Sequence, residues 1–188
     1  MKSIIAALYA AFLVLVISSC DNEIKNERLA RIDSLGTHLN YVRETVSSID
    51  PDLIDKRISE LTRTGNWVLD NITDTLAPKP GIRFGDYLRC KKFYDKASTR
   101  YDQVNRELQF SEQQLTTLRN DVKNSFYSDE DFEGYFNTES EAIRKLVEAT
   151  EELNDVYLGV NKQYEFTKPR ADQIVDSIKA IIYSPEPI

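Results

Sequence analysis

Residues 86–122, DYLRCKKFYDKASTRYDQVNRELQFSEQQLTTLRNDV, decide the fold class of this chain. Apolar and small residues recur in this segment at alternating steps of three and four, the period of a helix that packs along another helix. The segment contains no glycine or proline, and the whole chain of 188 residues has only six of each. It therefore predicts one long helix. The predicted seam consists of Tyr87, Cys90, Tyr94, Ala97, Tyr101, Val104, Leu108, Ser111, Leu115, Leu118 and Val122.

Three further runs have the same period. The seam of the first run and the seam of the second run are out of phase by one residue, and the change falls at Asp50-Pro51. Asp50 suits an N-cap, and Pro51 suits the first helical position. A kinked continuous helix is the alternative at this point. Ser128-Asp129-Glu130-Asp131 separates the last two runs, and we expect Pro169 to interrupt the final one. The three seams are Ile32, Leu35, Leu39, Val42, Val46 and Ile49; Ile54, Ile58, Leu61, Gly65, Val68 and Ile72; and Ile143, Leu146, Thr150, Leu153, Tyr157, Val160 and Tyr164.

These runs predict an all-α fold, an elongated antiparallel bundle of about four helices with coiled-coil character. We expect a first helical hairpin over 24–76 and a linker over 77–85, which contains two prolines and two glycines. A long helical hairpin with a C-terminal extension then follows over 86–183. Antiparallel pairing of its two arms places Cys90 near Thr167.

The charge of the chain limits its partners. The chain has 24 Lys+Arg and 31 Asp+Glu, a net charge of −7. One of the lysines and none of the acids precede Cys20, so the chain from Cys20 onward carries −8. A nucleic-acid-binding protein needs a basic stripe, and adsorption to anionic lipid by charge alone needs a basic patch. We therefore expect no nucleic-acid partner.

The amino terminus has the layout of a signal peptide. Lys2 supplies a positive charge, and Ile4–Ile17 forms an apolar run of 14 residues, shorter than the roughly 20 residues that cross a membrane. Ile17-Ser18-Ser19-Cys20 follows, and it resembles the lipobox of bacterial lipoproteins. An uncleaved anchor helix with an incidental cysteine is the alternative interpretation.

The lipobox resemblance implies the fate of this segment. Residues 1–19 would be removed by cleavage between Ser19 and Cys20, and Cys20 would carry the lipid, palmitate among its acyl chains, at a lipidated N-terminus over 20–23. Two or more acyl chains hold a protein on a membrane stably. The resemblance also implies a bacterial membrane as the location, facing the periplasm or the cell surface, with the outer membrane favoured.

Side chains that perform catalysis or bind metals form no recognised pattern. His38 is the single histidine, no Glu-x-x-His motif accompanies it, and the carboxylates around Glu139 indicate a solvated helix face. The chain contains neither a phosphate-binding glycine loop nor a Gly-x-Ser-x-Gly motif. Once Cys20 is lipidated, Cys90 has no partner, and we expect a packed, inert thiol rather than a redox-active one. We expect no enzymatic activity, no metal and no cofactor.

Two surface features are candidates for interaction or modification. A basic and aromatic cluster next to the predicted linker indicates a docking patch for an acidic protein or a glycan, the alternative being a hairpin base packed by long Lys and Arg side chains. This patch comprises Arg83, Tyr87, Arg89, Lys91, Lys92, Phe93 and Tyr94. Three Asp-Ser/Thr-apolar triplets resemble sites that some Gram-negative lineages O-glycosylate, although Ser and Thr could equally flank core aliphatics. Their acceptors are Ser34, Thr75 and Ser177.

Together these features predict a non-enzymatic, membrane-anchored lipoprotein that acts as a helical binding or scaffold module at the bacterial cell envelope. Its partner would be a protein or a glycan, and the heptad seams offer a route to oligomerisation. The alternative is a small-ligand carrier with an apolar pocket between helices. That pocket would be lined by Tyr94, Tyr101, Tyr157 and Tyr164.

Overall fold

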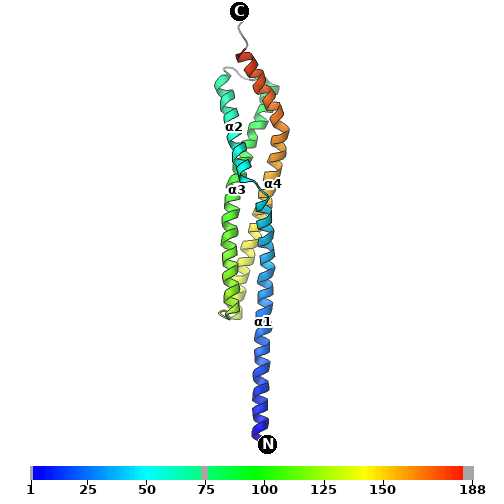
Figure 1. The fold of residues 1–188 in the computed structure, drawn as a ribbon, viewed down its shortest axis with the longest axis vertical. Helices are drawn as coiled ribbons and strands as arrows, with labels where there is room; N and C mark the ends of the chain where they lie inside the picture. The colour runs from blue at the N-terminus through cyan, green and yellow to red at the C-terminus, as the bar shows by residue number, and fades with distance from the viewer. Residues whose placement is uncertain (1, 73–75, 184–188) are drawn as a thin grey trace, which may run out of the picture. The chain divides into compact units, whose positions relative to one another are not determined.

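The computed structural model describes the backbone of residues 2–72 and 76–183, and the side chains of residues 22–72 and 76–183. Within these ranges the chain forms four helices and no strand (Figure 1). The helices are α1 (Lys2–Ser47), α2 (Pro51–Asn71), α3 (Pro78–Lys123) and α4 (Asp129–Ile182). The predicted all-α bundle is therefore confirmed. The predicted cleavage site and the side chain of Cys20 lie outside the described side chains, and Thr75 lies outside the described residues.

The chain stops and restarts between α1 and α2, as the reset of the seam predicts. Asp50 has an extended backbone (φ −94°, ψ 102°), and its carboxylate accepts a hydrogen bond of 3.0 Å from the Leu53 backbone N–H. Pro51 occupies the first helical turn, where a missing N–H costs nothing because that donor has no partner within the helix. Pro51 therefore starts a new helix instead of kinking a continuous one.

The α3–α4 connection is closed by two caps. The Phe126 N–H donates to the Asp121 carbonyl at 3.0 Å and the Ser125 N–H donates to the Val122 carbonyl at 3.1 Å, the pattern of a Schellman motif. Ser125 occupies the left-handed position (φ 56°) that usually holds glycine. The Asp131 N–H then donates to Ser128 Oγ at 3.2 Å and begins α4, whose first turn is acidic as predicted.

Two predicted helix boundaries are wrong. The predicted linker over 77–85 is helical from Pro78 onward, because prolines in a first helical turn remove only donors that lack partners. Pro169 lies inside α4 and does not end it. A proline inside a helix costs about 3 kcal/mol, but the next turns are held by packing: Ala171 and Ile178 are buried, and Lys179 lies over the Trp67 ring.

The chain divides into two compact units. Unit 1 comprises Met1–Arg43 and Glu107–Val147, and unit 2 comprises Glu44–Arg106 and Glu148–Ile188. Most of α1 therefore belongs to unit 1, whereas α2 belongs to unit 2. The predicted first hairpin over 24–76 is therefore divided between the two units, because most of α1 belongs to unit 1 and α2 to unit 2.

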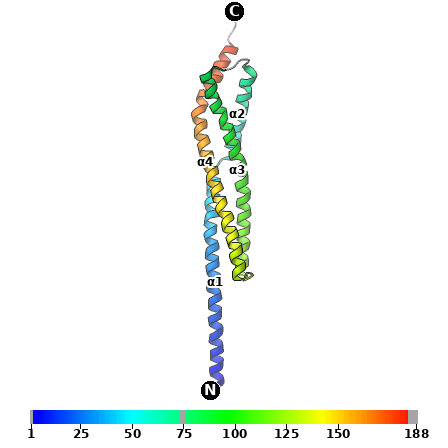
Figure 2. The ribbon, with the colours of Figure 1, turned by 180° about the vertical axis from the view of Figure 1, so that it is seen from behind.

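In unit 1, α1 runs antiparallel to α3 and parallel to α4. Contacts from α1 to α3 pair Lys25 with the Lys123 carbonyl, Asp33 with Arg119 and Arg43 with Glu112. Contacts from α1 to α4 pair Arg28 with Asp129 and Arg31 with Glu133. Arg28 and Arg31 also cover the ring of Phe132, which is fully buried. The three helices lie side by side in both views (Figures 1 and 2).

In unit 2, α3 and α4 are antiparallel. Cys90 Sγ lies 3.9 Å from Thr167 Oγ1, Tyr94 Oη donates to Asn161 Oδ1 at 2.7 Å, and Arg100 pairs with Glu152. The predicted proximity of Cys90 to Thr167 is confirmed. Alongside them, α2 contributes Gly65, where an added Cβ would lie 3.2 Å from Leu88 Cδ2.

The predicted seams form the core. All six positions of the first seam and all seven of the fourth are buried, and so are ten of the eleven positions of the α3 seam. Ile58, Ile72 and Tyr101 are half-buried. The 3-4 spacing thus identified the buried face of every helix. Beyond these seams, Phe84, Phe132, Thr167 and Ala171 are also buried.

Candidate functional site

A hollow of about 450 Å³ lies between α1 and α3 in unit 1. Gly36 lines it, and a Cβ built at Gly36 would meet no atom within 4 Å. Gly36 directly follows seam residue Leu35, and a glycine beside a helix seam is the one local signal of this hollow. The hollow is lined by Ile32, Asp33, Gly36, Thr37, Leu39, Asn40, Arg43, Glu112, Leu115, Thr116 and Arg119.

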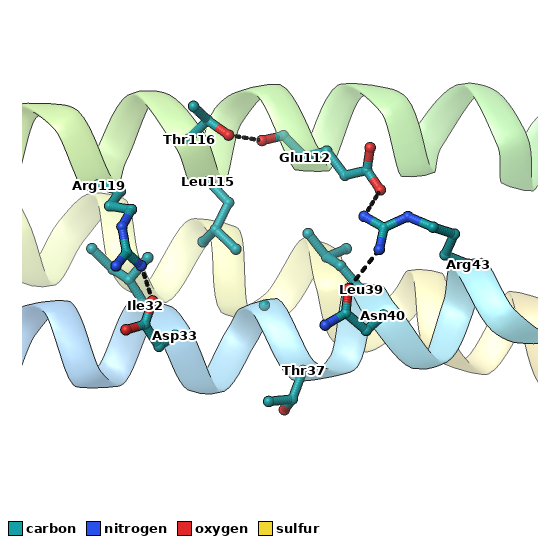
Figure 3. A pocket seen from close by; sticks show the side chains of 11 residues that line it. Ile32, Asp33, Thr37, Leu39, Asn40, Arg43, Glu112, Leu115, Thr116 and Arg119 are labelled. Atoms are coloured by element: carbon teal, nitrogen blue, oxygen red, sulfur yellow. Dashed lines mark hydrogen bonds and ion pairs between the residues drawn. The ribbon is translucent and has the colours of Figure 1, made fainter.

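Two ion pairs between α1 and α3 border the hollow (Figure 3). Arg119 pairs with Asp33 on one side, and Arg43 pairs with Glu112 at 2.5 Å on the other. Arg43 also donates to Asn40 Oδ1 at 2.6 Å, which fixes the guanidinium above the helix surface. Each charge has an opposite partner, so the border is polar but nearly neutral.

The floor of the hollow is apolar. Ile32, Leu39 and Leu115 are buried seam residues that line it. The two threonine hydroxyls at its edge bond to their own helices: Thr37 Oγ1 donates to the Ser34 carbonyl at 2.6 Å and Thr116 Oγ1 to the Glu112 carbonyl at 2.8 Å. An apolar floor within a paired polar border can accommodate an apolar side chain presented by a polar helix or loop.

The predicted docking patch does not form as one surface. Tyr87 and Tyr94 are fully buried, because both occupy seam positions that α3 turns toward α4. Phe93 is exposed, and the two neighbouring cations pair on their own helix, Arg89 with Asp86 at 3.0 Å and Lys91 with Asp95 at 2.8 Å. Lys92 and Arg83 are exposed. The two tyrosines are therefore removed from the patch.

Of the four tyrosines of the predicted carrier pocket, Tyr94 and Tyr164 pack against each other, and Tyr164 also packs against Tyr87. The ring centroids of Tyr87 and Tyr164 are 5.7 Å apart, and those of Tyr94 and Tyr164 are 6.0 Å apart. Tyr157 is buried, and its hydroxyl accepts a hydrogen bond of 3.4 Å from the Asp50 N–H. Burial raises the pKa of both Tyr94 and Tyr164 above the usual value of a phenol. Tyr94, Tyr157 and Tyr164 are buried and Tyr101 is half-buried, and the small-ligand carrier with a Tyr-lined pocket stays a prediction.

A charged network beside Tyr164 is a feature that the sequence does not predict. The Arg57 guanidinium lies 3.9 Å from the centroid of the Tyr164 ring and pairs with Glu165 at 2.8 Å. Glu60 pairs with Lys168 at 3.0 Å and with Arg57 at 3.5 Å. Burial opposes the charge of Glu60, but Tyr164, Lys168 and Arg57 together outweigh it, so the pKa of Glu60 lies below its ordinary value. The network joins α2 to α4, which no local spacing could indicate.

The remaining candidate side chains are dispersed. Cys90 is buried, as the seam predicts, and burial raises the pKa of its thiol. His38 is exposed on α1. Ser34 and Ser177 are exposed within helices, and the Ser177 hydroxyl donates to the Gln173 carbonyl at 2.8 Å. O-glycosylation at these serines stays a prediction. Within the described ranges, no group of three or more His, Cys, Asp or Glu side chains could hold a metal ion.

Comparisons with known proteins give no match. No family model, no curated protein and no solved structure is similar to this chain. Among the helices over the described residues, none is both long enough and apolar enough to cross a membrane.

Proposed function

We propose that this chain is a non-enzymatic lipoprotein, anchored through lipid on Cys20 to a bacterial envelope membrane, whose helices bind a protein partner. The observation that carries the anchor is the order of the amino-terminal residues. A positive Lys2, an apolar run of 14 residues and Ile17-Ser18-Ser19-Cys20 follow one another without interruption. The outer membrane, facing the periplasm or the cell surface, is the favoured location.

The start of the folded body fits an anchor at Cys20. Lys25, five residues after Cys20, donates to the Lys123 carbonyl, and Arg28 pairs with Asp129. Arg28 also donates to the Tyr127 carbonyl at 3.5 Å. Removal of residues 1–19 would therefore leave each of these contacts in place.

The hollow between α1 and α3 is the surface that we assign to the partner. Its apolar floor and its paired polar border suit an apolar side chain on an otherwise polar segment. Oligomerisation through the heptad seams is less favoured, because the seam residues are buried within the units. A second copy would have to displace that packing.

Lipid attachment can be tested by metabolic labelling with an alkyne analogue of palmitate. We expect label on the wild-type chain, no label on Cys20→Ala and full label on Cys90→Ala, which is the matched control because it removes the other cysteine. Retention of the label by Cys20→Ala would contradict the anchor.

Partner binding can be tested with a photo-crosslinking residue at Thr37, which is exposed and lines the hollow. The matched control site is Asn137, which is exposed on α4 and does not line the hollow. We expect a crosslinked species of defined mass from Thr37 only, and its loss when Gly36→Leu fills the hollow. An equal yield from both sites, or an unchanged yield in Gly36→Leu, would contradict this assignment.

A further inference from the structure

A second hollow, of about 400 Å³, lies in unit 2 between the start of α3 and the last turns of α4. Figures 1 and 2 show these two segments side by side. The hollow depends on the two departures from the predicted boundaries, since α3 begins as early as Pro78 and α4 continues through Pro169. Its size falls within the range of small-molecule sites, roughly 300–1,000 Å³.

Most of the lining is apolar. The apolar lining residues are Leu76, Ala77, Pro80, Ile174, Ile178 and Ile181. Ile178 is 8% exposed at the base, whereas Ile181 is 76% exposed, so the apolar wall extends from the core to the surface. Ile82, beside the hollow in sequence, is also 67% exposed. Exposed aliphatic residues next to an apolar hollow mark a binding surface more often than isolated ones do.

Among the described residues, the charged ones that line this hollow are both arginines, Arg83 from α3 and Arg170 from α4. Within residues 22–72 and 76–183, no carboxylate lines the hollow and neither arginine forms an ion pair. The Arg170 guanidinium also lies 4.2 Å from the centroid of the Phe166 ring, within the range of a cation–π contact. Two such cations stand out in a chain that carries −8 from Cys20 onward.

We propose that the unit 2 hollow binds a single-chain amphiphile with a carboxylate head group, that is, a fatty acid. The carboxylate accepts hydrogen bonds from Arg83 and Arg170, whose planar guanidinium groups match its two oxygens. The acyl chain lies over Leu76, Pro80 and Ile174 toward Ile178. This site is separate from the tyrosine core, and it does not depend on the lipid at Cys20.

A chain-length series tests the proposal on residues 21–188, which keep the described side-chain contacts because those begin after Cys20. Octanoate, decanoate and laurate are titrated by calorimetry below their micelle concentrations. Affinity should rise about fourfold per added CH₂, since each buried methylene contributes about 0.8 kcal/mol. Decanoate methyl ester should bind at least tenfold more weakly than decanoate, because it lacks the charge that the arginines recognise.

Variants separate this site from unspecific adsorption. Arg83→Gln and Arg170→Gln should each weaken decanoate binding about tenfold or more, and Ser177→Trp should block the hollow. Arg89→Gln is the control, because Arg89 is exposed, pairs with Asp86 and does not line the hollow. Circular dichroism confirms that each variant keeps its helical content. Equal affinity for acid and ester, equal affinity of the Arg83 and Arg89 variants, or no binding by decanoate and laurate would overturn the proposal.

Discussion

Replacing Gly36 by alanine should stabilise the protein. Gly36 lies in the interior of α1 and is half-buried. A Cβ at this position would meet nothing within 4 Å, so the added methyl group causes no overlap. Glycine in a helix interior is less favourable than alanine because it loses more backbone freedom on folding.

The expected magnitude follows from two contributions. The helix-propensity difference is about 1 kcal/mol, and partial burial of one methyl group adds a fraction of the roughly 0.8 kcal/mol that full burial contributes. The free energy of unfolding should therefore increase by about 1 kcal/mol or slightly more. For a chain of this size that increase raises Tm by about 2–4 °C.

Gly65→Ala is the matched control, because it has the same propensity gain but a different environment. Its Cβ would lie 3.2 Å from Leu88 Cδ2, so Leu88 must shift and part of the gain is lost. Urea unfolding of residues 21–188, followed by circular dichroism, should give a higher midpoint for Gly36→Ala than for Gly65→Ala. Loss of stability in Gly36→Ala, or a larger gain in Gly65→Ala, would refute the reasoning.

Three further predictions concern the α3–α4 turn and the charged network. Ser125→Gly should raise the free energy of unfolding by about 1 kcal/mol, measured by urea unfolding, because glycine adopts the left-handed conformation without strain; a loss of stability would contradict the Schellman assignment. The pKa of Glu60 is lower in the folded protein than in the unfolded chain. Its carboxylate therefore stabilises the fold at pH values above the unfolded pKa, and this stabilisation is lost as pH falls through the folded pKa. Glu60→Gln should therefore lower the free energy of unfolding at neutral pH and lower it by less in acid. A difference between the wild type and Glu60→Gln that does not change with pH would argue against this. The third prediction places the α3–α4 turn near the membrane when Cys20 carries lipid, since Phe126 is 71% exposed in the turn that contacts the start of α1. In a Trp67→Phe background on vesicles, brominated lipid should quench the tryptophan fluorescence of Phe126→Trp more strongly than that of Phe110→Trp. Equal quenching would place the turn away from the bilayer.

The buried face of each helix could be predicted from the sequence, because the 3-4 spacing is a local property that survives in any bundle. Even polar Ser111 and Thr150 were assigned correctly to the core on spacing alone. The cap at Asp50 was equally predictable, since it needs only Asp and Pro in consecutive positions. These features depend on residues within one or two turns of each other.

The choice of helix partners could not be predicted in the same way. An apolar seam specifies that a helix packs, not on which neighbour, so α2 was assigned to α1 although it packs in unit 2. Pro169 predicts a break by local rules, whereas the contact between Lys179 and Trp67, which helps to hold the turns after it, joins residues far apart in sequence. The hollow at Gly36 could not be placed from the sequence for a related reason: its lining comes from both α1 and α3, which are far apart in sequence.

Helix α1 runs without a break from Cys20 into unit 1, so an anchor at Cys20 would set the distance of the hollow from the membrane. Gly36 lies 16 residues after Cys20 on the same helix, which corresponds to about 24 Å at 1.5 Å per residue. With lipid on Cys20, α1 would be a helical spacer of fixed length between the lipid and the hollow, rather than a flexible tether. A protein that docks in the hollow would meet it at roughly that distance from the acylated residue, so a partner embedded in or resting on the same membrane could reach it.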